Sequence, residues 1–151
     1  MLFHKLISTC LGIGYIGKGA GTVAAVACSI CWYLKWSGGP PPIALSLIMT
    51  LVITAVGVWS SGVVAKIWGD DPARVVVDEA SGMCISLLFI PVSVAHILAG
   101  LILFRFFDIA KPLFIRKMEN FSGGWGIMLD DVLAGVYANL LLQAIVWLKL
   151  F

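Results

Sequence analysis

The sequence predicts an all-α integral membrane protein, in which a bundle of helices crosses or enters a lipid bilayer. Of its 151 residues, 61% are hydrophobic, and the mean hydropathy is +1.05. Soluble domains are only about 45–50% apolar, and a soluble fold of this size has too little interior to hide so much apolar surface. We therefore expect a single membrane domain over residues 1–151.

The same composition excludes a nucleic-acid partner. Only 12% of the residues are charged and the net charge is +2, and the chain has no basic run or aromatic-spaced basic patch. The four cysteines include one C-x2-C pair inside an apolar run with no nearby histidine, so we expect packing residues and no disulfide bonds. The sequence does not define an oligomeric state.

Four apolar runs, separated by polar or proline-rich segments, are the predicted helices. They cover residues 22–36, 43–67, 80–107 and 132–151, and polar segments 69–79 and 108–131 precede the last two runs. The second run is long enough to cross a bilayer, which needs roughly 20 residues. The turn at 37–42 contains three prolines, which cannot continue a helix. The glycine-rich stretch 123–126 is predicted to be a flexible loop.

Pro91 lies inside the third run and decides the topology. A straight helix from Glu79 to Asp108 would span about 43 Å, at 1.5 Å per residue, and would place these two acids on opposite faces of the membrane. Proline removes a backbone donor and clashes with the preceding turn. A break there would give helices over 78–90 and 92–108, a hairpin whose first arm is too short to cross the bilayer and is therefore re-entrant.

The distribution of basic residues favours the hairpin. It places eight of the ten lysines and arginines on one side of the membrane, whereas a straight helix divides them five and five. The eight are Lys5, Lys18, Lys66, Arg74, Arg105, Lys111, Arg116 and Lys117. Since basic residues concentrate on the cytoplasmic side, we expect a multi-pass protein of the inner (cytoplasmic) membrane with all acidic clusters at the cytoplasmic face.

Three acidic clusters border the apolar runs, at Asp78–Glu79, Asp108 and Asp130–Asp131. Carboxylates beside a membrane-thick apolar core are costly unless they are paired or bind a cation. Together they offer the hard oxygen ligands that Mg²⁺ prefers, usually shared with substrate phosphate and water. Such an ion could polarise a phosphorus centre and lower the pKa of a bound water.

Basic residues near these acids suit a phosphate. Arg105 could grip phosphate oxygens bidentately and Lys111 could act as a point charge. Gly19, Gly21 and Thr22 open the first long helix, where backbone N–H groups can face a phosphate. Each feature alone has a simpler interpretation: helix caps for Asp78 and Asp130, an ion pair for Arg105 and Asp108, and close helix packing for the glycines.

Three motifs resemble those of the phosphatidylglycerophosphatase A family in order and spacing: VVVDEASGM (75–83), FRFFDIAKPLFIR (104–116) and GGWGIMLDDVLAG (123–135). The resemblance runs from about Ala20 to the C-terminus. It implies Mg²⁺-dependent removal of the phosphate of phosphatidylglycerophosphate, a membrane lipid, to give phosphatidylglycerol. It also implies that Glu79, Asp108, Asp130 and Asp131 are the acidic site positions, with Arg105 and Lys111 as their cationic partners.

Taken together, motifs and resemblance give three sets of expected site residues. The catalytic set is Asp78, Glu79, Asp108 and Asp131; the phosphate-binding set is Arg105, Lys111 and Thr22; the metal-binding set is Glu79, Asp108, Asp130 and Asp131. Two alternatives stay open. One is a phosphatase of another phosphorylated lipid; the other is a non-enzymatic cation-binding or transport protein, which would hold its acids near the bilayer midplane.

The first motif departs from the family pattern P-G-T-x-G-S-L. This chain reads Ala20-Gly21-Thr22-Val23-Ala24-Ala25-Val26, which keeps Gly21 and Thr22 and replaces the proline, the second glycine and the serine. If this stretch touches phosphate, a hydroxyl and a close backbone approach are lost, which predicts altered substrate choice or weakened activity.

Overall fold

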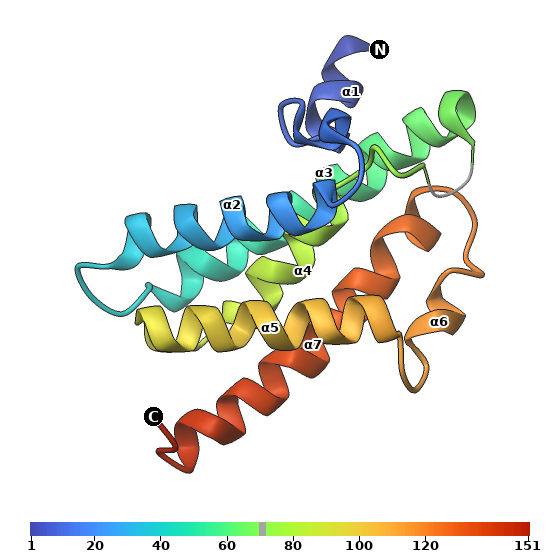
Figure 1. Cartoon of the computed structure of the whole chain (residues 1–151). Helices are drawn as coiled ribbons and strands as arrows, with labels where there is room; N and C mark the ends of the chain where they lie inside the picture. The colour runs from blue at the N-terminus through green and yellow to red at the C-terminus, as the bar shows by residue number, and fades with distance from the viewer. Residues whose placement is uncertain (70–71) are drawn as a thin grey trace.

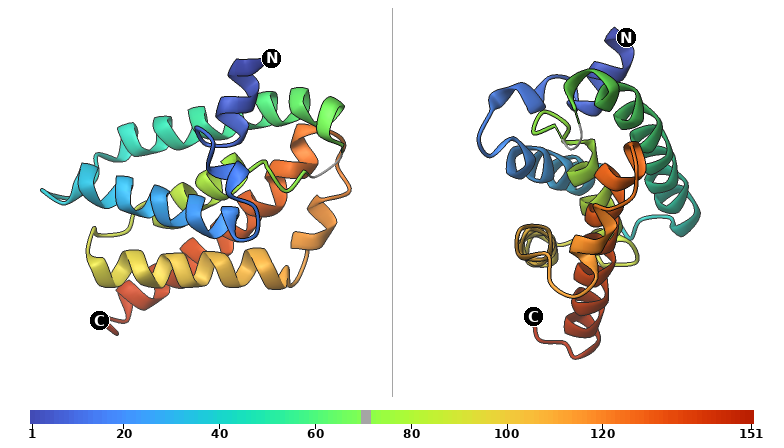
Figure 2. Two further views of the ribbon diagram at one scale, coloured as in Figure 1. Left: turned by 45° about the horizontal axis from the view of Figure 1, so that its top comes forward. Right: turned by 90° about the vertical axis from the view of Figure 1, so that its right-hand side faces the viewer.

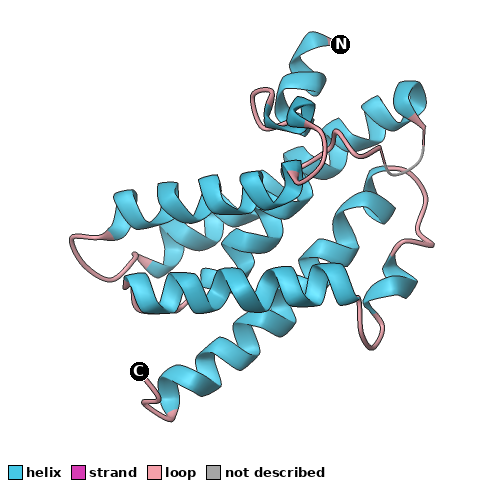
Figure 3. Ribbon diagram, in the orientation of Figure 1, coloured by secondary structure: helices cyan, strands magenta, loops and turns pink. Residues whose placement is uncertain are grey.

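The computed structural model describes residues 1–69 and 72–151, and in this part of the chain it contains helices and no strand (Figures 1 and 3). The all-α prediction is confirmed. The elements are α1 (Leu2–Ser8), a 3₁₀ turn η1 (Ile13–Ile16), α2 (Ala20–Trp36), α3 (Ile43–Trp68), α4 (Val77–Leu87), α5 (Val94–Ala110), α6 (Ile115–Met118) and α7 (Gly124–Trp147).

The short helix α4 lies at the centre of the bundle. It packs most extensively against α7 and is flanked by α2 and α3, while α5 covers another part of α7 (Figure 2). The interior where α4, α5 and α7 meet is closed by fully buried side chains, among them Met83, Phe104 and Leu142. This arrangement places the first turn of α4 beside the first turn of α2, at Gly21, and beside the last turns of α5, at Arg105.

The third apolar run is broken near Pro91, as predicted. Helix α4 ends at Leu87, and the chain takes a left-handed backbone conformation at Phe89 before Pro91. Helix α5 then begins with a side-chain cap, because the Ser93 hydroxyl accepts a hydrogen bond of 3.1 Å from the backbone N–H of His96. The start of α4 and the end of α5 therefore lie at the same end of the bundle.

Two helices, α3 and α7, are long and apolar enough to cross a membrane by length and composition. The interior face of α3 is small and polar, with Ser46, Thr50 and Ser60 at most 4% exposed. Its outer face is apolar, with Leu51 66% and Trp59 58% exposed. This pattern is the reverse of a helix on the surface of a soluble protein.

The prediction for the start of the last helix was wrong. Helix α7 begins at Gly124 instead of residue 132, so the stretch from Gly124 to Gly126 is helical and is not a flexible loop. A Cβ at Gly124 would overlap the carbonyl oxygen of Val58 on α3, and a Cβ at Gly126 would overlap that of Phe121. These glycines allow close backbone contact.

Candidate active site

A cavity of about 490 Å³ opens at the end of the bundle where α4 begins and α5 ends. Its walls come from the loop before α2, residues 72–75, and the helices α4, α5 and α7. Seven of the eight predicted site residues line it: Asp78, Glu79, Arg105, Asp108, Lys111, Asp130 and Asp131. The structure thus joins three motifs that are far apart in the sequence.

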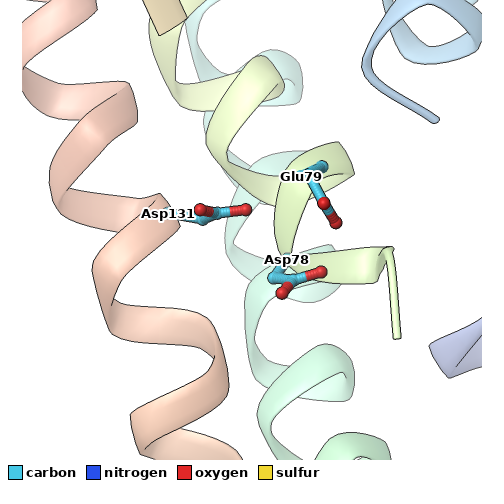
Figure 4. A group of neighbouring side chains, drawn as sticks. All are labelled: Asp78, Glu79 and Asp131. Carbon is cyan, nitrogen blue, oxygen red and sulfur yellow. The ribbon is translucent and has the colours of Figure 1, made fainter. Parts of the chain in front are cut away.

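Three carboxylates converge in this cavity, those of Asp78 and Glu79 in the first turn of α4 and that of Asp131 on α7 (Figure 4). One oxygen of each lies within 4.8 Å of the others. Asp78 and Asp131 are 8% and 3% exposed. Within the described residues, Asp78 Oδ1 and Glu79 Oε2 are buried and have no hydrogen-bond partner.

The electrostatics of this group favour a bound cation. Burial raises the pKa of Asp78 well above its usual range, and the nearby charges of Glu79 and Asp131 raise it further. Burial also raises the pKa of Glu79, although the Arg105 guanidinium opposes that rise. Clustered oxygens that lack hydrogen-bond donors are the ligands of a hard divalent ion. The residues present therefore fit a divalent metal.

The other two carboxylates of the cavity are held by cations. Arg105 Nη1 donates to Asp108 Oδ2 one helical turn along α5 and lies 3.8 Å from Glu79 Oε1. Lys111 Nζ donates to Asp130 Oδ2 at 2.6 Å and also to Glu119. Burial alone would lower the pKa of Lys111, but these two carboxylates raise it above its ordinary value, so the ammonium stays charged.

This grouping differs from the expected metal-binding set at three residues: it adds Asp78 and leaves out Asp108 and Asp130. Asp78 joins Glu79 and Asp131, whereas the side chains of Asp108 and Asp130 accept hydrogen bonds from Arg105 and Lys111. Capping does not explain Asp130, because it lies inside α7, beyond the first turn. The N-cap of α4 is Val76, and no side chain caps that helix end.

The first motif contributes Gly21 to the cavity and not Thr22. Thr22 is exposed and is not among the lining residues, so the structure does not bring it to the other phosphate-binding candidates. A Cβ at Gly21 would overlap the Glu79 carboxylate, so any larger residue there would displace that side chain. Of the three departures from the family pattern, Ala20 lines the cavity, whereas Ala24 and Ala25 are at most 2% exposed and do not line it.

Sequence reasoning missed part of the cavity wall. Gly17 and Lys18 line it and were not predicted, whereas Gly19, which also lines it, was predicted to face a phosphate at the start of the first long helix. Both glycines have left-handed backbone conformations, with φ of 94° and 85°. A lysine between two glycines before a helix was the available signal. Glu119 was also missed as a partner of Lys111, and no local pattern in the sequence connects them.

Converging carboxylates beside two ion-paired cations at one end of a helical bundle fit the site of a phosphatase. The chain belongs to the phosphatidylglycerophosphatase A family: the family model "Phosphatidylglycerophosphatase A" matches residues 6–146. Members of this family are phosphatases, so the protein is a phosphoric monoester hydrolase.

Relatives support this assignment over most of their length. A protein of Bacteroides thetaiotaomicron with the provisional name phosphatidylinositol-3-phosphatase is 43% identical over 94% of this chain and 92% of its own. Phosphatidylglycerophosphatase A of Haemophilus influenzae is 36% identical over 93% of this chain and 86% of its own. Phosphatidylglycerophosphatase A of Escherichia coli is 34% identical over 87% of this chain and 76% of its own. No solved structure matches this chain.

Proposed function

We propose that this protein hydrolyses the phosphate monoester of phosphatidylglycerophosphate and releases phosphatidylglycerol and phosphate in phospholipid synthesis. The observation that carries the proposal is the cavity in which three carboxylates converge beside Arg105 and Lys111. The names of the Haemophilus influenzae and Escherichia coli relatives support the choice of lipid.

Asp78, Glu79 and Asp131 would hold a divalent cation, for which Mg²⁺ is the natural candidate because their oxygens are hard ligands. When bound, such an ion supplies Lewis-acid polarisation of the phosphate and a more acidic bound water. Two of these side chains come from one turn of α4 and the third from the adjacent α7. The closest pair of helices in the bundle therefore positions the site.

The two cations have separate parts in the reaction. Asp108 holds the Arg105 guanidinium in one orientation. The remaining N–H groups of Arg105 are therefore preorganised to grip phosphate oxygens. They include the buried Nε, which has no hydrogen-bond partner among the described residues. Lys111 stays protonated and adds positive charge that offsets the charge developing on the phosphate during transfer. The partly buried cavity strengthens both interactions by limiting water.

A multi-pass location in the cytoplasmic membrane agrees with the surface of the helices. The outward apolar face of α3 suits lipid, and its small polar interior face suits helix contact within a bilayer. The acids lie in the first turn of α4 and the last turns of α5, at the end of the bundle where the basic residues concentrate. We therefore infer a re-entrant α4–α5 hairpin with the cavity at the cytoplasmic interface. A transporter, in contrast, would hold its acids near the middle of the bilayer.

A phosphoinositide is the second candidate substrate, because the Bacteroides thetaiotaomicron relative carries a phosphatidylinositol-3-phosphatase name. The test is phosphate release by the purified protein in detergent from phosphatidylglycerophosphate and from phosphatidylinositol 3-phosphate, with Mg²⁺ and with EDTA. We expect Mg²⁺-dependent release that is faster from phosphatidylglycerophosphate. A faster reaction with the inositol lipid would reassign the substrate, and no release from either would contradict the proposal.

The orientation is tested separately with a membrane-impermeant thiol reagent on intact spheroplasts, in a background lacking the native cysteines. Ser37 and Ser122 are both exposed and lie at opposite ends of the bundle. We expect Ser37→Cys to react from outside and Ser122→Cys to react only after lysis. The reverse pattern would contradict the cytoplasmic placement of the cavity.

A further inference from the structure

A second hollow, a groove of about 210 Å³, runs between α2 and α5 and is separate from the charged cavity. Its principal walls are Val26, Ile30 and Tyr33 on α2 and Val94, Leu98 and Leu101 on α5. The surface that these described residues present to the groove is apolar throughout. Ile30, Val94 and Leu98 are each more than half exposed, so the groove is open to the surroundings of the bundle.

The groove continues the face of α5 that carries the phosphate-binding residues. Positions 94, 98, 101, 105 and 108 follow one another in steps of three and four, which places them on one face of a helix. Arg105 and Asp108 line the cavity, and Leu101, one turn or about 6 Å from Arg105, begins the groove. The apolar wall and the charged wall are therefore parts of one stripe.

Helix α2 shows the same continuity from the opposite direction. It runs antiparallel to α5, so its first turn lies at the end of the bundle where α5 ends (Figure 1). Gly21 lines the cavity and Val26 lines the groove. The exposed Thr22 lies between them, on the face that Val26 and Tyr33 continue. A ligand that leaves the cavity along α2 and α5 passes Thr22 and enters the groove.

We propose that this groove binds one acyl chain of the phosphorylated lipid whose phosphate occupies the cavity; the inference rests on the function proposed above. A molecule that joins a charged phosphate to a long apolar chain matches the charged cavity and the apolar groove in their order along α5. From Arg105 to Val94 the path is about 16 Å at 1.5 Å per residue. Every methylene that enters the groove leaves water or loose lipid for a defined apolar contact.

Photolabelling distinguishes a substrate site from general lipid contact without altering the protein. The probe is a non-hydrolysable phosphonate analogue of phosphatidylglycerophosphate with a diazirine in one acyl chain; the matched control is phosphatidylcholine with the same chain. We expect the analogue to label groove residues several-fold more than the control, and unlabelled phosphatidylglycerophosphate to remove the excess. Equal labelling by both lipids would identify bulk membrane lipid as the occupant and overturn the inference.

Filling the groove gives an independent kinetic test. Ile30→Trp and Leu98→Trp enlarge two exposed groove residues, while Leu34→Trp and Ile102→Trp change the 70% and 68% exposed neighbours that do not line it. With long-chain phosphatidylglycerophosphate we expect a roughly tenfold loss of kcat/KM in the groove variants only. With a dibutanoyl analogue, too short to fill the groove, all four variants should match the parent protein.

The outcomes separate the two proposals. If the parent releases no phosphate from either chain length, the proposed function fails. If the parent is active and the groove variants lose the same factor on both chain lengths, or lose nothing on the long chain, the acyl-chain site alone is overturned.

Discussion

The two sides of the cavity solve the problem of buried charge in different ways. On the α5 side, Asp108 and Asp130 accept hydrogen bonds from Arg105 and Lys111. On the α4 side, Asp78, Glu79 and Asp131 crowd together, and two of their buried oxygens have no hydrogen-bond partner in the described residues. The carboxylates of the first side have their cations within the protein, whereas those of the second side gain most from a ligand.

This difference indicates that the α4 side of the cavity is arranged for function at a cost in folding stability. Burying a carboxylate costs several kcal/mol unless an opposite charge or hydrogen bonds compensate. The ion-paired side has this compensation within the chain. On the crowded side, burial and then the nearby like charges raise the pKa of Asp78, and without a cation we expect this crowding to destabilise the folded protein. Substitutions on the two sides should therefore separate activity from stability.

The largest effect is expected on the crowded side. Glu79→Gln and Asp131→Asn should each reduce phosphate release by about a thousandfold or more, because each removes one charged ligand from a site with few protein ligands. In metal-free protein the same variants should unfold at a temperature equal to or above that of the parent, since one buried like charge is removed. Phosphate release at saturating Mg²⁺ measures the loss of activity, and thermal unfolding in EDTA measures the stability of the metal-free protein. Near-normal rates would show that these acids are structural.

The second effect concerns the paired side. Arg105→Lys should lower kcat/KM by roughly 10- to 100-fold, because an ammonium cannot reproduce the planar guanidinium fork and a charge-assisted hydrogen bond is worth about 1.5–3 kcal/mol. Arg105→Ala should be worse, since Asp108 also loses its partner. Combining Arg105→Lys with Asp108→Asn completes a double-mutant cycle. A purely structural pair would show its damage in unfolding temperature, with unchanged activity per folded molecule.

The sequence predicted that these acidic and basic residues would lie together, because they occur in short motifs. The order of the acids, the break at Pro91 and the resulting meeting of Glu79 with Arg105 all followed from local patterns, and the structure places these residues in one cavity. Proline and carboxylates act over a few residues, so their consequences can be derived without tertiary contacts.

Other features depended on contacts between distant segments and were not predictable. The Lys111–Glu119 pair requires the path of the chain through α6, and the helical state of Gly124 requires the backbone of α3 beside it. The grouping of Asp78 with Asp131 depends on the rotation of α4 against α7, which the apolar runs do not specify. Thr22 was expected in the cavity by its neighbourhood in sequence, but helical periodicity turns it outward.

A smaller effect should follow from crowding the acids further. Gly21→Ala places a methyl group where the Glu79 carboxylate lies, so we expect a roughly tenfold loss of kcat/KM through displacement of that side chain. Alanine also favours a helix over glycine by about 1 kcal/mol, so stability should not fall in proportion. Gly38→Ala is the matched control, since nothing lies within 4 Å of a Cβ there. Equal activities of the two variants would contradict the close approach of α2 to Glu79.

The smallest effect is expected at the outer edge of the paired side. The Glu119 side chain is 40% exposed, whereas that of Asp130 is 10% exposed, and both accept from the same Lys111 ammonium. An exposed ion pair contributes only about 0–1 kcal/mol and is screened by salt, so Glu119→Gln should change kcat/KM by less than about twofold. Asp130→Asn removes the buried partner and should cost clearly more in both activity and unfolding temperature. Measuring kcat/KM and unfolding temperature of both variants at low and high salt ranks the two contacts. Salt screens the exposed pair, so the losses caused by Glu119→Gln should shrink as salt rises, whereas those caused by Asp130→Asn should not. If Glu119→Gln equals Asp130→Asn in its losses, Lys111 is positioned by the pair as a unit, and the paired side depends on the α6 segment as much as on α7.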